Sequence, residues 1–293
     1  MDPVLVATDG TRAAVPALRL AAAFAARDGV AVELVSVVRP IADMVVALPH
    51  REELEQAHAR GVAERVRAQL IDAVGSLDWP LHVRVGRPAA AICEVARHRS
   101  ASLILLGAAR SDPEGGGTAL EVIQLADRPV LSTRSGTMPR TAVVGIDFRP
   151  GSLNAAMEAF RLVGPDGVLH LVHVRPRLDF PAALVWDWGE SYECEVSHGF
   201  ERLVAALAAA GAGDTRTHTV EGDPAGALAA VSAETHADLL AVGSDGYTFR
   251  GRVVIGRVAQ RLVREAPVAV VAIPDPRGEN AAIGEAEAVG HPV

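Results

Sequence analysis

The stretch AVVGIDFR, residues 142–149, is a short apolar run that ends in an acidic turn, and the chain carries a second version of it, VLVATDGT, at residues 4–11. An aspartate closes each run, Asp147 in the later stretch and Asp9 in the earlier one, 138 positions apart. Three further pairs of similar stretches follow in the same order: 32–40 with 169–176, 85–96 with 221–232, and 102–110 with 238–246. The chain is therefore a duplication with a repeat of about 137 residues.

The duplication divides the chain into two copies and a tail. The seam lies near RSGTMPR, residues 134–140, where small and turn-forming residues cluster. We expect a first domain at 1–136, a second at 137–275 and a flexible tail at 276–293, because the last residues are mostly small and polar.

Short continuous apolar runs alternate with longer alanine-rich stretches inside each copy. In the second copy the expected strands are 142–147, 168–174, 216–220, 238–243 and 268–273, and the expected helices are 151–163, 190–210, 224–235 and 256–265. Strands that are apolar on both faces and separated by helices predict a parallel sheet covered on both sides. The predicted fold class is α/β: two tandem doubly wound, Rossmann-like domains, each with a mostly parallel five-stranded sheet and about four helices.

Each copy ends in an apolar strand, at residues 129–133 and 268–273. The edge of such a strand needs a partner. We expect the two edges to pair across a pseudo-twofold axis, so that the chain forms an intrachain pseudo-dimer. A further homodimer of the whole chain stays open.

Composition limits the kinds of partner. The formal net charge is −8 and aromatic residues make up only 4% of the chain, which argues against nucleic acid or an anionic membrane as the main partner. The apolar runs are too short to cross a bilayer, and the first residues lack the basic region of a signal peptide. Cys93 and Cys194 lie far apart in the sequence and outside any CxxC pattern, so we expect both to be reduced thiols. We expect a cytoplasmic protein without membrane insertion.

The stretch GSDGYTFRGRVVIG, residues 243–256, spaces its glycines as G-x2-G-x9-G. Gly243 closes an apolar strand and Gly256 opens a helix, where free N–H groups and the positive end of the helix dipole attract anions. Three arginines lie in or beside the same stretch: Arg250, Arg252 and Arg257. The spacing matches neither the Walker nor the dinucleotide pattern. The stretch is either a cradle for phosphates or a solvated glycine-arginine loop.

These features together resemble the universal stress protein family: an aspartate ending the first strand, G-D-P before the third helix, and G-x2-G-x9-G after the fourth strand. The resemblance covers about 270 residues and implies a tandem universal stress protein. In ATP-binding members of the family, the glycines hold ribose and phosphates, the aspartate lies by the nucleoside, and backbone near the end of strand two contacts adenine. Carried over, the resemblance implies a site in the second copy for ATP, with or without Mg²⁺. The residues of this site would be Asp147, Val174, Gly243, Gly246, Gly256, Arg257 and Val258.

Two departures from the family pattern bear on the site. Arg257 stands where the family has Ser or Thr; its charged fork would bind phosphate, fill the pocket or point to solvent. In the first copy, Arg110 replaces the second glycine, and Gly107 is separated from Gly116 by eight residues instead of twelve. Asp112 and Glu114 add negative charge there, so we expect the first site to be degenerate.

Other polar clusters carry less weight. His170 and His173 lie three apart on one predicted strand, so they point to opposite faces and do not chelate one metal ion together. We interpret the acidic stretch WDWGESYECE, residues 186–195, mostly as a loop and a solvated first helical turn. The sequence has no G-x-S-x-G elbow and no Ser/His/Asp set in a supporting context, so we assign no catalytic residue.

The leading hypothesis is a nucleotide-responsive stress or dormancy factor that binds ATP or a related adenine nucleotide in its second copy. At most it would hydrolyse ATP slowly, with Asp147 as the best candidate base. One alternative is an interaction module that has lost nucleotide binding, which Arg257 and the altered first loop favour. Another is an α/β enzyme of the adenine-nucleotide hydrolase-like superfamily, which would need catalytic residues that the sequence does not display.

Overall fold

The computed structural model describes residues 2–40, 51–75, 78–108, 117–175, 186–244, 247–249, 252–254 and 256–274. Several residues discussed above lie outside these ranges: Arg110, Asp112, Glu114, Gly116, Gly246, Arg250 and the tail at 276–293.

The first copy contains β1 (Val4–Ala7), the 3-10 turn η1 (Arg12–Ala14), α1 (Val15–Asp28), β2 (Val32–Val38), α2 (Arg51–Val74), β3 (Leu81–Val85), α3 (Pro88–His98), β4 (Leu103–Gly107), α4 (Gly117–Leu125) and β5 (Val130–Thr133). The second copy repeats this order with β6 (Thr141–Gly145), α5 (Pro150–Val163), β7 (Val168–Arg175), α6 (Trp186–Ala209), β8 (Asp214–Glu221), α7 (Pro224–Glu234), β9 (Leu239–Ser244), α8 (Arg257–Glu265) and β12 (Ala269–Pro274). The predicted α/β class and the alternation of strands and helices are confirmed.

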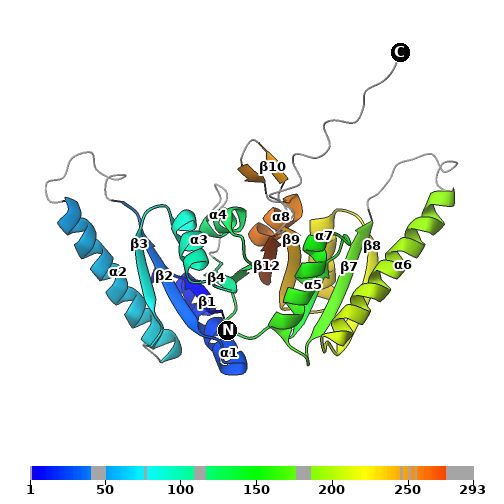
Figure 1. The fold of residues 1–293 in the computed structure, drawn as a ribbon. Helices are drawn as coiled ribbons and strands as arrows, with labels where there is room; N and C mark the ends of the chain where they lie inside the picture. Colours follow the sequence, from blue (N-terminus) through cyan, green and yellow to red (C-terminus); the bar gives the residue numbers. More distant parts are fainter. Residues whose placement is uncertain are drawn as a thin grey trace, which may run out of the picture.

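All strands of the two copies except one short hairpin join in a single ten-stranded sheet, in the order β3-β2-β1-β4-β5-β12-β9-β6-β7-β8. Neighbouring strands are parallel within each copy, whereas β5 and β12 meet antiparallel in the middle, with Leu131 opposite Val271. The expected pairing of the two last strands is therefore present. Counted outward from this seam, the two halves of the sheet have matching strand orders, β5-β4-β1-β2-β3 and β12-β9-β6-β7-β8 (Figure 1).

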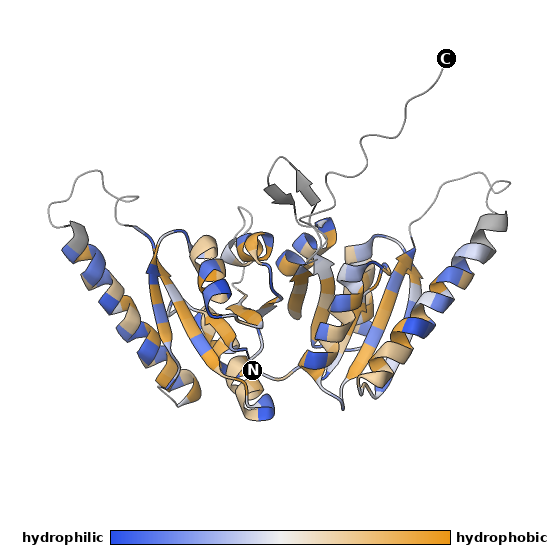
Figure 2. Cartoon of the chain, in the orientation of Figure 1, coloured by the Kyte–Doolittle hydropathy of each residue, from blue (hydrophilic) through white to orange (hydrophobic). Residues whose placement is uncertain are grey.

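Helices cover both faces of the sheet. The side chains of its inner strands alternate between two apolar clusters, one on each face. Val144 lies in the cluster that includes side chains of α1, α2, α5 and α6. Its neighbour Val143 lies in the cluster with α3, α4, α7 and α8. Both clusters contain residues of both copies, so each core layer runs through the seam. The strands are the most hydrophobic elements in Figure 2.

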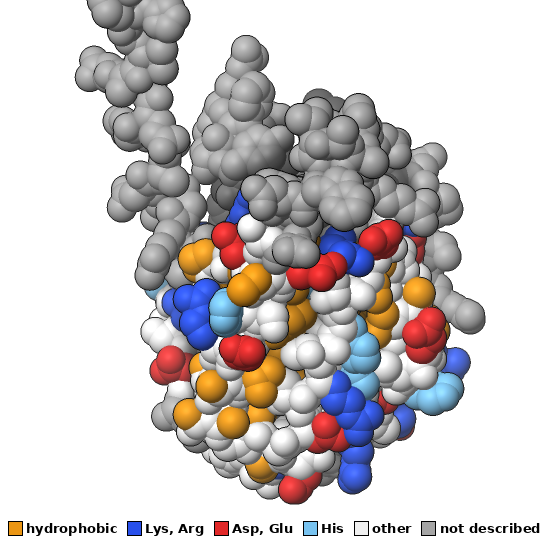
Figure 3. Space-filling model, turned by 90° about the vertical axis from the view of Figure 1, so that its right-hand side faces the viewer, with side chains coloured by type: hydrophobic (Ala, Val, Ile, Leu, Met, Phe, Trp, Pro, Cys, Tyr) orange, Lys and Arg blue, Asp and Glu red, His pale blue; other side chains and the backbone are white. Residues whose placement is uncertain are grey.

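The outer edge of the second copy is protected by polar residues. β8 has the sequence DTRTHTVE and a mostly half-exposed or exposed face. Figure 3 looks onto this side of the molecule, where acidic, basic and histidine side chains interrupt the apolar surface. Charges of this kind on an edge strand hinder pairing with another sheet.

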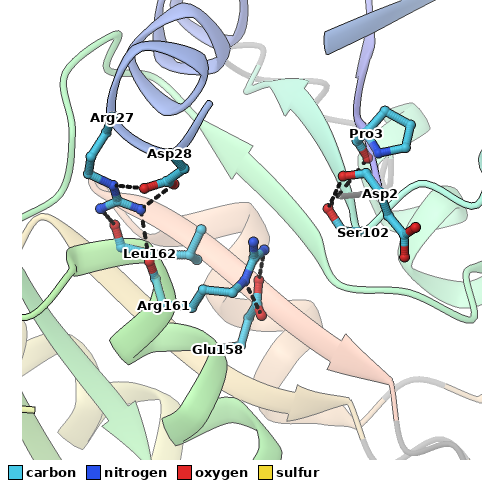
Figure 4. A network of polar contacts seen from close by, with 8 residues as sticks. All are labelled: Asp2, Pro3, Arg27, Asp28, Ser102, Glu158, Arg161 and Leu162. Atoms are coloured by element: carbon cyan, nitrogen blue, oxygen red, sulfur yellow. Dashed lines mark hydrogen bonds and ion pairs between the residues drawn. The ribbon is translucent and has the colours of Figure 1, made fainter. Parts of the chain in front are cut away.

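One arginine of the first copy forms hydrogen bonds with the second copy where the ends of α1 and α5 meet (Figure 4). Arg27, in the last turn of α1, donates to the carbonyl oxygens of Leu162 (2.8 Å) and Arg161 (2.9 Å) at the end of α5. The same guanidinium bonds to Asp28 beside it. A cation that satisfies the last carbonyls of a helix also complements its dipole.

The structure differs from the sequence-based prediction at two elements. α6 begins at Trp186, so the interpretation of residues 186–195 as mostly a loop is wrong; acidic residues early in a helix are stabilised by its dipole. The glycine stretch contains a two-stranded hairpin, β10 (Tyr247–Phe249) with β11 (Arg252–Val254), rather than only a loop. Its β-branched and aromatic residues favour strands. Among the described residues, no helix is long and apolar enough to cross a membrane.

Candidate functional site

The strand order reverses at the same place in each copy. β6 is flanked by β7 on one side and β9 on the other, and β1 by β2 and β4. The loops that leave two such neighbouring strands in opposite directions open a crevice at their carboxyl ends, where doubly wound proteins bind ligands. Of the site residues implied by the resemblance, all but Gly246 lie in the part of the second copy that the structure describes.

Asp147 lies two residues beyond β6 and is exposed. Its Oδ1 accepts a hydrogen bond from the backbone N–H of Arg149 at 3.0 Å. Asp9 in the first copy does the same with Thr11, at 2.9 Å. Each aspartate thus builds the turn between its strand and the next helix, and both aspartates are exposed.

The residue after each aspartate has a left-handed backbone. Gly10 has φ of +78° and Phe148 has φ of +63°. A phenylalanine is strained in this region, whereas a glycine is not. The ring of Phe148 packs against His173 and Phe200, with centroid separations of 5.1 and 5.2 Å, and this packing offsets the strain.

Val174 and Val258 lie on one face of the sheet, since both pack against the same apolar cluster. Val174 is near the end of β7 and Val258 is the second residue of α8. α8 also packs against β9, which pairs with β6. The end of strand two and the start of the last helix therefore lie on the same face of the sheet, Val174 on β7 and α8 against β9, the two strands that pair with β6.

Gly243 has a packing reason of its own. A Cβ at this position would lie 2.9 Å from the backbone carbon of Gly151 in the first turn of α5. At the matching position in the first copy, a Cβ on Gly107 would lie only 1.9 Å from the carbonyl oxygen of Ala13. Both glycines allow the helix after the first strand to approach the fourth strand, and the sequence did not distinguish this role from contact with a ligand.

The start of α8 is electrostatically suited to an anion. Gly256 is the N-cap, Arg257 is the exposed first residue, and the first turn holds no acidic residue. An arginine opposes the helix dipole at this end, at a cost of about 0.3–1 kcal/mol. A bound phosphate would remove that repulsion and accept from both the guanidinium and the N–H groups.

The first copy contains a cavity of about 480 Å³ at the matching strand ends. Its apolar wall includes Val35, Val37, Ile92 and Leu106, and its polar wall includes Thr8, Asp9, Arg39, Thr118, Arg134 and Arg264. Arg264 and Val263 come from α8 of the second copy. Apart from Asp9, sequence reasoning missed these residues; a further signal was Thr118, a hydroxyl residue that follows a glycine at the start of α4.

Buried polar pairs differ between the copies on the other strands. Glu33 on β2 is ion-paired to Arg99 and His82, both at 2.7 Å. The Arg99 hydrogen bond is the main reason that the pKa of Glu33 lies below its usual value, and burial opposes it. In the second copy, His170 Nδ1 lies 2.9 Å from His218 Nε2. Burial is the main cause that lowers the pKa of His170, and the charge of His218 adds to it.

The histidines of β7 do not form a metal site with each other. His170 faces His218, whereas His173 bonds to the Ile146 carbonyl oxygen (2.8 Å) and the Tyr192 hydroxyl (2.6 Å) in the other layer. Within the described residues there is no group of three His, Cys, Asp or Glu side chains that could hold a metal ion. The prediction that these two histidines point to opposite faces is confirmed.

Two doubly wound units in tandem, joined in one sheet with a strand reversal in each unit, define a Rossmann-like α/β architecture. Residues 1–134 and 138–274 each match the sequence model of the universal stress protein family. The chain belongs to this family, and it holds two of its domains.

Individual relatives agree with this assignment. A universal stress protein of Methanocaldococcus jannaschii is 26% identical over 141 residues, which are 47% of this chain and 83% of that protein. The crystal structure of a universal stress protein from Archaeoglobus fulgidus has a TM-score of 0.65 at 18% identity, over 93% of this chain and 98% of that chain. A functionally unknown protein from Pseudomonas aeruginosa gives 0.61 at 13% identity, over 94% and 93%. At these identities, the two solved structures establish the fold alone.

Proposed function

We propose that this tandem universal stress protein binds ATP or a related adenine nucleotide in its second copy, as a nucleotide-responsive stress or dormancy factor. The observation that carries the proposal is the start of α8, where Gly256 caps the helix, Arg257 is exposed and the first turn holds no acidic residue; α8 packs against β9, which pairs with the strand that precedes Asp147. Such an arrangement binds the phosphates of a nucleotide through backbone N–H groups and one charged fork.

Val174 and Val258 supply the apolar contacts of this proposed site. Both belong to the edge of the same buried cluster, and an adenine ring needs an apolar wall with a few backbone hydrogen bonds. Asp147 is placed to accept hydrogen bonds from the ribose. Any Mg²⁺ would arrive with the phosphates, and we assign it no protein ligand.

The experiment is isothermal titration of the full chain with Mg-ATP, which we expect to give about one site per chain. Gly246→Val should abolish binding, since a β-branched residue adds bulk to a glycine of the implied cradle and restricts φ. Asp147→Ala should weaken binding less, because it leaves the phosphate contacts in place. Mass spectrometry of small molecules released from the denatured protein would identify the nucleotide. Unchanged ATP binding by Gly246→Val would refute this site.

The cavity of the first copy favours a second candidate: a ligand site in that copy too, for a small anionic molecule with an apolar part. Three arginines and the start of α4 provide the charge, while Val35, Val37 and Leu106 provide the apolar wall. In the same titration this site would appear as a second binding step that Asp9→Ala weakens and Gly246→Val leaves intact. Absence of any nucleotide binding would instead favour the interaction module.

A further inference from the structure

The two copies meet at α8 in an asymmetric way. The first residue of α8 belongs to the proposed nucleotide site of the second copy, whereas Val263 and Arg264 near its end line the cavity of the first copy. α8 has nine residues and therefore spans about 13 Å. α4 of the first copy packs against α8 and against β11 of the hairpin (Figure 1).

Arg134 fixes the end of this helix from the first copy. It follows β5, lines the cavity, and its Nη1 donates a hydrogen bond to the carbonyl oxygen of Ala266. Ala266 is the C-cap of α8, and its own N–H bonds to the Leu262 carbonyl. A cation on the last carbonyls stabilises a helix and complements its dipole.

The contact is specific to this side of the seam. Ala126 ends α4 as Ala266 ends α8, since each N–H returns to the residue four positions before it. Counting on from these two alanines, the position that corresponds to Arg134 is Pro274. Proline has no side-chain donor, so α4 receives no equivalent contact from that position.

A helix as short as α8 does not hold its place through local hydrogen bonds alone, because isolated helices shorter than about 12–15 residues are marginal in water. Its position depends on anchors such as Arg134 at the end and the Arg261–Asp223 ion pair (2.6 Å) to α7. The Nε of Arg134 is buried without a hydrogen-bond partner among the described residues. An anion in the cavity that accepted from this guanidinium would tighten the anchor.

We propose that Arg134 is a positioning residue for the nucleotide site of the second copy, and that α8 couples this site to the cavity of the first copy. The inference rests on the proposed nucleotide site. Loosening α8 at its end increases the disorder of Gly256 and Arg257 at its start. The conformational entropy lost when these residues become ordered then opposes nucleotide binding. By linkage, nucleotide at the start of α8 also tightens its contacts with the first copy.

The test measures Mg-ATP affinity and amide hydrogen exchange in the full chain. Arg134→Ala should weaken ATP binding about fivefold, the lower end of typical coupling between sites, and speed exchange across residues 260–265, whose N–H groups bond within α8. Arg134→Gln keeps an N–H donor and should recover most of the affinity. ATP should slow exchange in α4 of the wild-type chain, and Arg134→Ala should remove that protection.

The matched control is Arg128→Ala. Arg128 also lies in the first copy and donates from Nη1 to a backbone oxygen (Ala101, 2.8 Å). Its buried Nε has no hydrogen-bond partner among the described residues and lies 3.5 Å from Oδ1 of Asp127. Its acceptor precedes β4 instead of ending α8, so this variant should retain wild-type affinity. Equal ATP affinity and equal exchange at 260–265 in the two alanine variants would overturn the inference. If the wild-type chain binds no ATP, the proposed function fails, and the exchange comparison alone decides the role of Arg134.

Discussion

At the scale of single residues, Gly243 packs so closely on α5 that a Cβ would lie 2.9 Å from the backbone carbon of Gly151. Asp147 and Arg257 are exposed where the resemblance placed them, whereas Gly243 is required for close packing on Gly151. The reason is that a residue type indicates what a side chain is able to do, and its neighbours across the fold determine which of those roles it performs. The predictions at this scale concern charge and exposure.

Arg257→Ser should lower the affinity for Mg-ATP several-fold. The variant restores a hydroxyl but removes an exposed positive charge at the start of α8, where it would contact phosphate. The salt dependence of binding should become flatter, because one charge pair fewer is screened. Titrations at two salt concentrations measure both effects. Arg202→Ser, which removes an exposed charge on α6, is the control; a rise in affinity for Arg257→Ser would mean that Arg257 obstructs the pocket.

A thiol reagent at pH 8 should modify one cysteine per native chain, Cys194, which is exposed. Cys93 is buried, and burial raises the pKa of its thiol to about 11. The thiolate is the reactive form, so Cys93 should react only after unfolding. Mass spectrometry of the labelled chain gives the count, and Cys194→Ser should abolish native labelling. Two thiols that react at similar rates would contradict the burial of Cys93.

At the scale of elements, local sequence patterns predicted the helices and strands, but contacts between elements determine which residue types are required at particular positions. Two mid-helix glycines illustrate the difference. In α6, a Cβ on Gly199 would lie 2.6 Å from the Phe148 ring, whereas in α2 a Cβ on Gly61 would find only the end of the Arg65 side chain, at 3.8 Å. The same residue type is thus required in one helix and dispensable in the other.

Gly199→Ala should therefore lower the free energy of unfolding by about 1–3 kcal/mol, because the added methyl group displaces the Phe148 ring. Gly61→Ala should raise it by about 0.5–1 kcal/mol, the usual gain from removing a glycine inside a helix. Urea denaturation of the two variants measures both values. The same sign for both substitutions would show that the packing of α6 on Phe148 does not control stability.

Glu33→Gln should destabilise the protein by about 1–3 kcal/mol at pH 7, since it breaks charged hydrogen bonds to a buried group. The pKa of Glu33 is lower in the folded protein than in the unfolded chain. Its contribution is therefore fully present above the unfolded pKa of 4.5 and is lost as the pH falls through the folded pKa. Urea denaturation at pH 7 and pH 4 should show the difference between wild type and variant shrinking at the lower pH. A pH-independent difference would mean that the charge of Glu33 is not what stabilises the β2–β3 pair.

At the scale of the whole molecule, the two copies form one sheet and two continuous core layers. Besides the β5–β12 strand pair, single arginines reach across the seam: Arg27 to the end of α5 and Arg134 to the end of α8. Because these contacts satisfy helix-terminal carbonyls, their loss should loosen one copy relative to the other.

Arg27→Ala should reduce stability by about 1–3 kcal/mol, because two carbonyl oxygens at the end of α5 lose a charged donor from the other copy. Arg161→Ala is the matched control: Arg161 bonds to Glu158 within α5 (2.6 Å), and a pair of this kind contributes about 0.2–0.5 kcal/mol. Thermal unfolding of both variants provides the comparison. An effect of Arg27→Ala no larger than that of Arg161→Ala would show that the hydrogen bonds of Arg27 to α5 do not hold the copies together.

The sequence by itself determined the duplication, the order of strands and helices, the aspartate turns and the α/β class, because periodicity, turn residues and repeats are local properties that each copy displays independently. It also predicted the pairing of β5 with β12, since an apolar edge needs a partner. Only the tertiary structure decided that α6 begins at Trp186, that a cavity opens in the first copy, and that α8 of the second copy lines this cavity. These features depend on contacts such as Arg134 with Ala266, which lie 132 positions apart in the chain and leave no pattern in either segment alone.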